Sequence, residues 1–149
     1  MRTLELSPRL MSVAGLVPRG ARLADVGTDH AYLPAWLILH GVIPSAIAAD
    51  LRKGPLERAR ATAEKYDLTN AMDFRLCNGL SGVSPDEVEA IAIAGMGGET
   101  IAEVLSAAPW TREGGKQLLL QPMSAQPELR RWLQSHGYVI RQELLSKEG

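Results

Sequence analysis

The chain has 149 residues, a length that fits a single domain with a buried core. Hydrophobic residues make up 46% of it and charged residues 22%, which is typical of a folded globular protein and excludes a disordered one. The formal net charge of -1 excludes a surface that is basic all over, although a local basic face stays compatible with RNA binding.

Cysteine usage and the absence of long apolar runs bear on the compartment. The single cysteine, Cys77, cannot form an internal disulfide, which suits a reducing environment. The first residues mix Arg2 and Glu5 into short apolar pieces and show no signal-peptide pattern, and no apolar run is long enough for a bilayer. We therefore expect a cytoplasmic protein without membrane contact. We also expect no metal site, because the three histidines lack ligand spacing with one another or with Cys77.

Hydrophobic periodicity predicts helices and strands in alternation. A short helix is expected to begin at Ser7-Pro8, where serine suits the N-cap and proline the first turn, and to end near Pro18. The elements expected after it are strand 22–26, helix 31–40, strand 45–49 ending at Asp50, helix 54–66, strand 72–77, strand 88–94, helix 99–107, strand 117–120, a helix beginning at Pro127 and strand 139–145. This order predicts an α/β fold with a Rossmann-like, doubly wound and mostly parallel sheet.

Small, polar and acidic residues follow five of the predicted strands. In doubly wound sheets, ligands bind at the carboxyl ends of the strands. The segments at these ends are Asp25-Val26-Gly27, Asp50-Leu51, Asn78-Gly79-Leu80, Gly95-Met96-Gly97-Gly98 and Gln121-Pro122-Met123. We therefore expect a binding site along this edge of the sheet.

The loop after the first strand indicates which cofactor the site takes. The dinucleotide fingerprint G-x-G-x-x-G is absent, because only Gly27 is present, and Asp29 would repel a pyrophosphate. S-adenosylmethionine has no phosphate and carries two positive groups, a sulfonium and an ammonium, that Asp25 and Asp29 can attract. Asp50 closes the second strand, where an acidic residue binds ribose hydroxyls. The pattern favours S-adenosylmethionine over a nicotinamide cofactor.

Several of these residues also have plainer structural interpretations. Asp29 suits the N-cap of the next helix, and His30 suits a packed position or a helix terminus. Tyr32 and Met96 fit the wall of a pocket as well as specific contacts. Cys77 fits a small buried hydrophobic residue.

The chain resembles the class I methyltransferases and, more narrowly, the bacterial tRNA 1-methyladenosine methyltransferases that act on adenine 22 (the TrmK family). The resemblance covers nearly the whole sequence. The segments that carry it are Leu6-Ser7-Pro8-Arg9-Leu10, Ala24-Asp25-Val26-Gly27-Thr28-Asp29-His30-Ala31-Tyr32-Leu33-Pro34, Ala49-Asp50 with Gly54-Pro55-Leu56, Asn78-Gly79-Leu80, Ile93-Ala94-Gly95-Met96-Gly97-Gly98-Glu99 and Leu120-Gln121-Pro122-Met123.

The resemblance implies that the first four strand ends bind S-adenosylmethionine. The implied cofactor contacts are Asp25, Gly27, Thr28, Asp29 and His30 for the methionine part, Asp50 and Leu51 for the ribose, Asn78, Gly79 and Leu80 for the adenine, and Ala94, Gly95, Met96 and Gly97 near the transferable methyl group.

The resemblance further implies methyl transfer to N1 of adenine 22 in tRNA, but it assigns no catalytic roles. Our own candidate catalytic residue is Asp29, because a carboxylate there, like backbone carbonyls near Gly95, can stabilise the positive charge that moves to the base. The candidate RNA contacts are Arg9, Arg19, Arg22, Tyr32 and Lys53. Each arginine fits an ordinary solvated surface position equally well.

The sequence departs from the related enzymes at two points. Gly95-Met96-Gly97-Gly98 stands where many amino-methylating relatives carry Asn or Asp, two prolines and an aromatic residue, so the target nitrogen is expected to be held by backbone groups. The sequence also ends at Gly149, whereas the family continues into a final sheet strand and a helical C-terminal domain. We therefore expect residues 1–149 to be one cofactor-binding catalytic domain without that strand and that domain.

Two other functions stay open. A class I methyltransferase that acts on a protein or a small molecule is favoured by the weak net charge, and a non-catalytic cofactor- or RNA-binding module is the second alternative. A nicotinamide-dependent oxidoreductase is disfavoured because glycines are missing between Thr28 and Tyr32.

Overall fold

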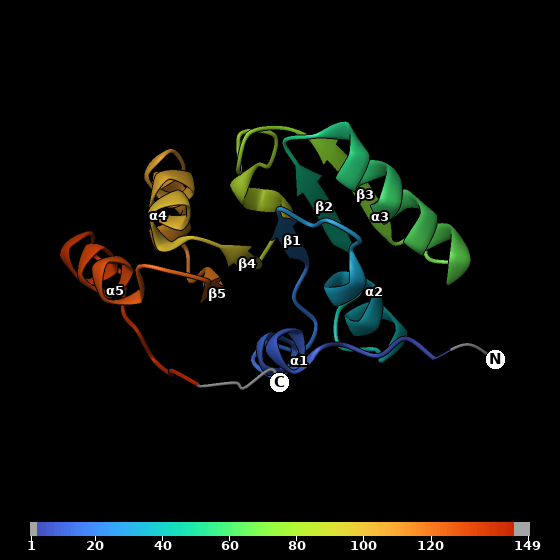
Figure 1. Cartoon of the computed structure of the whole chain (residues 1–149), viewed down its shortest axis with the longest axis horizontal. Coiled ribbons are helices and arrows are strands. Elements are labelled where there is room, and N and C mark those ends of the chain that lie inside the picture. The colour runs from blue at the N-terminus through green and yellow to red at the C-terminus, as the bar shows by residue number, and fades with distance from the viewer. Residues whose placement is uncertain (1–2, 145–149) are drawn as a thin grey trace.

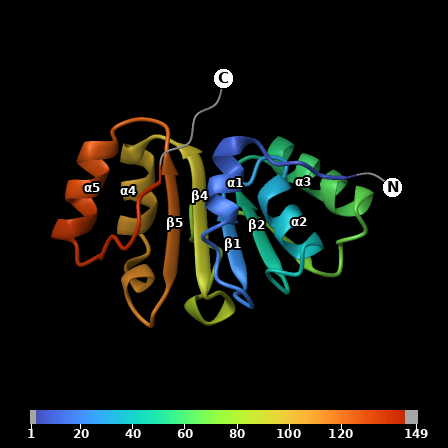
Figure 2. The same cartoon turned by 90° about the horizontal axis from the view of Figure 1, so that it is seen from below.

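A computed structural model describes residues 3–144 of the chain (Figure 1). Five parallel strands form one sheet in the order β3-β2-β1-β4-β5, which confirms the predicted α/β fold (Figure 2). The strands are β1 (Leu23–Val26), β2 (Ala46–Asp50), β3 (Met72–Leu76), β4 (Ala90–Met96) and β5 (Gln117–Pro122). The helices are α1 (Pro8–Ala14), α2 (Tyr32–Leu39), α3 (Lys53–Lys65), α4 (Gly98–Ser106) and α5 (Gln126–Ser135), with 3-10 turns η1 (Pro85–Glu87) and η2 (Pro109–Arg112).

Helices cover both faces of the sheet, so the core has two halves. Alternate residues of β1 point to opposite faces. Leu23 packs in the half formed with α1, α2 and α3, whereas Ala24 and Val26 pack in the half formed with α4 and α5. Because both faces are buried, β1, β2 and most of β4 are almost continuously apolar.

The strand order places a topological switch point between β1 and β4. The helices that follow β1 and β2 lie on one face, and those that follow β4 and β5 lie on the other. Val26, the last residue of β1, pairs with Ile93 of β4, so the carboxyl ends of these two strands are neighbours. In open α/β sheets, the ligand crevice opens at this place.

The predicted start of the first helix is confirmed, but its predicted end is too late. The Ser7 hydroxyl accepts a hydrogen bond from the Leu10 N–H at 3.3 Å, and Pro8 begins α1. The helix ends at Ala14 rather than near Pro18, because Gly15 caps it there. Val17 is nevertheless buried, which explains why the helical spacing of apolar residues continues past the helix.

The predicted strand at 139–145 is wrong for the six of its residues that the structure describes. Residues 139–144 form no regular structure, Val139 is 82% exposed, and Leu145 lies outside the described residues. Within residues 3–144, β5 is the edge strand and no further strand pairs with it. Apolar alternation alone does not make a strand, because an extended segment also needs a neighbour for its backbone hydrogen bonds.

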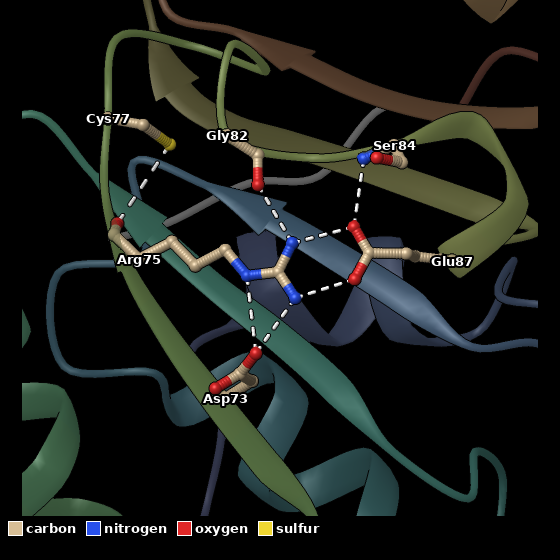
Figure 3. A network of polar contacts seen from close by, with 6 residues as sticks. All are labelled: Asp73, Arg75, Cys77, Gly82, Ser84 and Glu87. Carbon is tan, nitrogen blue, oxygen red and sulfur yellow. Dashed lines mark hydrogen bonds and ion pairs between the residues drawn. The ribbon is translucent and has the colours of Figure 1, made fainter.

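An ion-pair network ties β3 to the crossover that leads to β4 (Figure 3). The guanidinium of Arg75 donates to both carboxylate oxygens of Glu87, at 2.7 and 2.6 Å, and to Asp73 Oδ2 at 2.8 Å. It also donates to the Gly82 carbonyl at 2.8 Å. The Arg75 hydrogen bonds, helped by the Ser84 N–H, hold the pKa of Glu87 down at about 2. This bidentate contact fixes the path of the chain between the carboxyl end of β3 and β4.

Candidate functional site

The loop after β1 has an unusual backbone. Gly27, Asp29 and Ala31 all have positive φ angles, of 71°, 52° and 59°. Such angles are costly for alanine and tolerable for aspartate, and they cluster at binding sites. The structure contains no hydrogen bond from the N–H groups of Asp29 or His30 to any residue in 3–144. A loop with alternating backbone conformations and open N–H groups suits a carboxylate, such as that of a bound amino acid.

Asp25 is a buried carboxylic acid at the end of β1. Its side chain is only 5% exposed, and Oδ2 accepts a hydrogen bond from the Thr28 hydroxyl at 2.8 Å. Burial raises the pKa of Asp25 to about 7; the Thr28 hydrogen bond opposes this, and the charge of Asp50 adds to it. Among the ion pairs of residues 3–144, none involves Asp25. A buried acid without a cationic partner is a place where a cationic ligand binds favourably.

Asp50 closes β2 beside Asp25. Its Oδ1 accepts the Arg52 N–H at 3.1 Å, and its other carboxylate oxygen makes no hydrogen bond to the described residues. The side chain is buried at 9% exposure, and the following Leu51 is 64% exposed. The Asp50 carbonyl accepts the Cys77 N–H at 2.9 Å, which draws the end of β3 alongside. Cys77 itself is half-buried, whereas the sequence led us to expect a buried hydrophobic residue there.

The segment after β3 lies at the same edge of the sheet. Gly79 has a φ of 60°, and a Cβ there would lie 3.3 Å from the Val104 side chain of α4. Leu80 is buried in the core, whereas Asn78 is exposed at the edge. Leu80 therefore anchors the segment and leaves Asn78 accessible at this edge of the sheet.

Met96 brings the loops after β1 and β4 together. A Cβ added to Gly27 would lie 2.3 Å from Met96 Cε, so a larger residue there would displace the tip of the methionine side chain. Ala94 and Gly95 precede Met96 on β4, and Gly95 has a φ of 83°. The methionine side chain therefore forms a wall at the switch point, between the two strand ends.

Gly97 and Gly98 begin α4 against the loop that follows β5. The Gly98 N–H donates to the Ser124 carbonyl at 2.9 Å. A Cβ on Gly97 would lie 2.9 Å from Ser124 Oγ, and one on Gly98 would lie 2.7 Å from the Ala125 carbonyl oxygen. The backbone contacts make glycine necessary at position 98, so part of this glycine-rich segment has a structural reason.

We expect Gly98→Ala to lower the free energy of unfolding by roughly 1–3 kcal/mol, because backbone atoms occupy the space that the new methyl group needs. Chemical denaturation measures this change. The matched control is Gly54→Ala in α3, where a Cβ would have only Arg58 Nη1 nearby, at 3.6 Å. That substitution is expected to be neutral or stabilising. Equal stability of the Gly98→Ala variant and the unsubstituted protein would contradict the packing argument.

Arg9 of α1 reaches the same edge of the sheet from the N-terminal segment. Its Nη1 donates to Gln121 Oε1 at 3.0 Å, and the same oxygen accepts the Gly95 N–H at 3.0 Å. The Gln121 Nε2 donates to Met123 Sδ at 3.3 Å. One glutamine therefore connects α1, the end of β4 and the end of β5.

Asp29 lies at the rim but faces α3. Its carboxylate, 62% exposed, forms an ion pair with Arg58 at 2.8 Å. It is not the N-cap of α2: that position is Ala31, which has no side-chain cap. His30 and Tyr32 stack on each other with ring centroids 4.8 Å apart, beside a cavity of about 200 Å³. The catalytic role of Asp29 stays a prediction.

Arg22 lies apart from the other predicted residues. It immediately precedes β1, at the amino-terminal edge of the sheet, and its guanidinium is paired with Glu89. A cavity of about 520 Å³ opens at this edge, but its arginines, Arg22 and Arg75, are already bound by Glu89 and Glu87. We therefore place the candidate site at the opposite, carboxyl edge, and this position of Arg22 does not favour an RNA contact shared with that site.

The two remaining candidates differ in position. Lys53 begins α3, directly after the β2 end that carries Asp50. Arg19 is exposed in the turn between α1 and β1, on the same connection as Arg22. Lys53 is therefore near the candidate site.

Two residues that contact candidate site residues were not singled out from the sequence. Arg58 is 29 positions from its partner Asp29, and no local spacing indicates that contact. Gln121 can be noticed in the sequence, because it is a polar residue near the end of an apolar strand. Its contact with Arg9 cannot be predicted in the same way, because the two residues are 112 positions apart.

Comparison with known proteins shows which family has this sequence and fold. The family model described as a methyltransferase domain matches residues 6–149. The chain belongs to this methyltransferase family. The tRNA (adenine(22)-N(1))-methyltransferase of Bacillus subtilis is 38% identical to it over 148 residues, which are 99% of this chain and 62% of the relative. This similarity confirms the resemblance inferred from the sequence.

Solved structures of relatives have the same fold. The crystal structure of the B. subtilis m1A22 tRNA methyltransferase TrmK superimposes with a TM-score of 0.93 and covers 98% of this chain and 62% of that one. A Streptococcus pneumoniae relative in complex with S-adenosyl-L-methionine has 43% identity and a TM-score of 0.83, over 89% of this chain and 63% of its own. The chain thus spans slightly less than two thirds of the length of these relatives.

Within residues 3–144, the part that the structure describes, neither a membrane-spanning helix nor a metal cluster is present. None of the helices in this part is long and apolar enough to cross a membrane. The same residues contain no group of three or more His, Cys, Asp and Glu side chains placed to hold a metal ion.

Proposed function

We propose that residues 1–149 form the S-adenosylmethionine-binding catalytic domain of an enzyme that methylates N1 of adenine 22 in tRNA. The observation that supports this cofactor is the presence of two buried acids, Asp25 and Asp50, at the carboxyl ends of the neighbouring strands β1 and β2 in a methyltransferase fold. The tRNA substrate is supported by the similarity to the B. subtilis enzyme over 99% of the chain.

The site fits the chemistry of this cofactor. Asp25 is buried and unneutralised beside the loop after β1, which suits the ammonium group, and the open N–H groups of Asp29 and His30 suit the carboxylate. Asp50 offers a carboxylate oxygen to the ribose hydroxyls. In this proposal Leu51 lies beside the ribose, exposed Asn78 beside the adenine, and Met96 beside the methyl group.

When bound, S-adenosylmethionine supplies an electrophilic methyl group on a sulfonium. The N1 atom of a neutral adenine has a lone pair, so the chain does not have to remove a proton from it before transfer. The base gains positive charge, and carbonyl groups near Gly95 together with the acidic edge stabilise it. The residues of the chain therefore act by alignment and electrostatics. Because N1 is hidden in a Watson–Crick pair, the target adenine must be unpaired or extruded.

The test is methyl transfer by the full-length protein to transcribed tRNA, followed by nucleoside mass spectrometry. We expect 1-methyladenosine from tRNA with adenine at position 22 and none when guanine replaces it. Transfer to proteins or small metabolites instead would support the first alternative function. Tight cofactor binding without transfer to any of these would support the non-catalytic alternative.

Arg9 is proposed to contact the tRNA backbone. We expect Arg9→Ala to leave S-adenosylmethionine affinity unchanged, because the cofactor is held by the ends of β1 to β4, and to lower the rate of tRNA methylation several-fold at limiting tRNA. Calorimetry and initial rates measure the two quantities. Unchanged methylation rates would remove Arg9 from the substrate site.

A further inference from the structure

A small groove lies between the start of α2 and one side of α3, next to the loop after β1. The two helices pack against each other on one face of the sheet (Figure 2). The groove has a volume of about 200 Å³, below the roughly 300 Å³ of a pocket that encloses a drug-sized ligand, so it suits one flat ring. Its α3 wall is a single helical face, because Arg58, Thr62 and Lys65 follow one another at i, i+4 and i+7.

Aromatic rings form the opposite wall of this groove. The rings of His30 and Tyr32 stack with their centroids 4.8 Å apart and their planes within 6° of parallel. Tyr32 is nevertheless 40% exposed, so part of its surface is open to a further ring. Nucleobases stack on such side chains whatever their identity, because every base has a flat π-face. The wall therefore suits a base of a single-stranded nucleic acid.

The charged residues that line the groove are cations. Arg58 is already held by the Asp29 carboxylate at 2.8 Å. Lys65 makes no ion pair within residues 3–144, and its Nζ lies 5.4 Å from the centroid of the Tyr66 ring. An exposed ammonium beside aromatic rings suits a phosphate that is joined to a stacked base. The larger cavity at the amino-terminal edge differs, because three acidic residues line it.

The groove is beside the proposed cofactor site but lies away from the point of methyl transfer. The transferred methyl group is proposed to lie beside Met96 on β4, whereas α3 packs over β2 and β3. Because β1 separates β2 from β4 and neighbouring strands are about 4.8 Å apart, the two places are about 10 Å or more apart. A nucleotide in the groove is therefore a neighbour of the extruded adenine and not the adenine itself.

We propose that this groove holds one nucleotide of the tRNA next to the target adenine, with its base stacked on Tyr32 and its phosphate bound by Lys65. This inference rests on the proposed tRNA substrate and adds a second point of contact to it. Extruding the adenine costs stacking with its neighbours. Stacking of one neighbour on Tyr32 offsets part of that cost, and it does so without selecting a sequence.

Two substitutions in the full-length protein separate the phosphate contact from the stacking contact. The probe is a tRNA transcript with guanine at position 22, so binding is measured without methylation at that position. In filter-binding titrations over a range of salt concentrations, Lys65→Gln should lower the slope of log affinity against log salt by about 0.7, the loss of one phosphate contact. Tyr32→Leu should weaken binding about tenfold without changing the slope. Tyr32→Phe keeps a ring and should bind as tightly as the original protein.

Arg131→Gln is the charge-matched control. Arg131 lies on α5, on the opposite face of the sheet from α3, and its side chain is 70% exposed. The substitution removes the same unit charge as Lys65→Gln, so its salt slope and affinity should match those of the original protein. The melting temperature and the S-adenosylmethionine affinity of Lys65→Gln should also be unchanged, because the Lys65 side chain is exposed and lies outside the cofactor site.

Other outcomes overturn the inference. An unchanged salt slope in Lys65→Gln, or equal affinity of Tyr32→Leu and Tyr32→Phe, would mean that the groove does not hold a nucleotide. An equal fall of the slope in Arg131→Gln would mean that only the overall charge matters. Methyl transfer to tRNA with adenine 22 is measured separately on the unsubstituted protein, so normal transfer with any of these results removes this inference alone. Failure of the unsubstituted protein to bind and methylate tRNA would remove the proposed function as well.

Discussion

Replacing Asp25 by asparagine is expected to stabilise the protein at pH 8 and to weaken its binding of S-adenosylmethionine. Burial raises the pKa of Asp25 to about 7 in the folded chain, whereas an aspartate in an unfolded chain has a pKa of about 3.9. Between these values the folded state retains a proton that the unfolded state has lost, so stability falls as the pH rises from about 4 to about 7. Asparagine avoids this cost and still accepts the Thr28 hydrogen bond.

The expected gain in free energy of unfolding is on the order of a few kcal/mol at pH 8 and close to zero at pH 4, where Asp25 is protonated in both states. Denaturation curves of both proteins at pH 4, 6 and 8 measure it. A difference that is the same at all three pH values would contradict the assigned pKa. A less stable asparagine variant at pH 8 would contradict the absence of a cationic partner.

Cofactor binding by the same variant should change in the opposite direction. A bound cation favours the ionised form of Asp25, so affinity for S-adenosylmethionine in the original protein should rise with pH up to about 7. In Asp25→Asn the affinity should be at least tenfold weaker at pH 8 and should lack this rise. Titration calorimetry at pH 5.5 and 8 measures both effects, and equal affinity of the two proteins at pH 8 would refute the assignment.

Asp50→Ala is expected to weaken S-adenosylmethionine binding by tenfold or more. The substitution removes a carboxylate oxygen that makes no hydrogen bond within the described residues, and a charged hydrogen bond to ribose contributes about 1.4 kcal/mol or more. The expected loss is in affinity rather than in folding, so the calorimetric titration is paired with a thermal melt. Asp86→Ala removes an exposed carboxylate from η1, at the other edge of the sheet, and serves as the control. Unchanged affinity in Asp50→Ala would show that Asp50 does not bind the ribose of the cofactor.

The fold could be predicted from the sequence because its signals are local. The apolar run of β4 and the helical spacing of α3 are read within single segments, and the boundaries differ by only one or two residues in most cases. The strand expected at 139–145 failed because strand formation depends on a partner that the sequence pattern does not contain.

The candidate site was predicted less completely than the fold. The acids Asp25 and Asp50 were identified because each ends a strand, which is again a local signal. Two contacts could not be predicted, because they depend on how elements far apart in the sequence pack. They are the ion pair of Asp29 with Arg58 and the hydrogen bond of Arg9 to Gln121. Arg22 looked equivalent to Arg9 in the sequence, yet the structure places it at the amino-terminal edge, where Glu89 neutralises it.

The most direct test of the account is a calorimetric titration of the purified protein at pH 8 with S-adenosylmethionine and, separately, with NAD. The buried acids Asp25 and Asp50 at the ends of β1 and β2 predict saturable binding of one S-adenosylmethionine per chain and no measurable heat from NAD. Binding of NAD, with no response to S-adenosylmethionine, would contradict the proposed site.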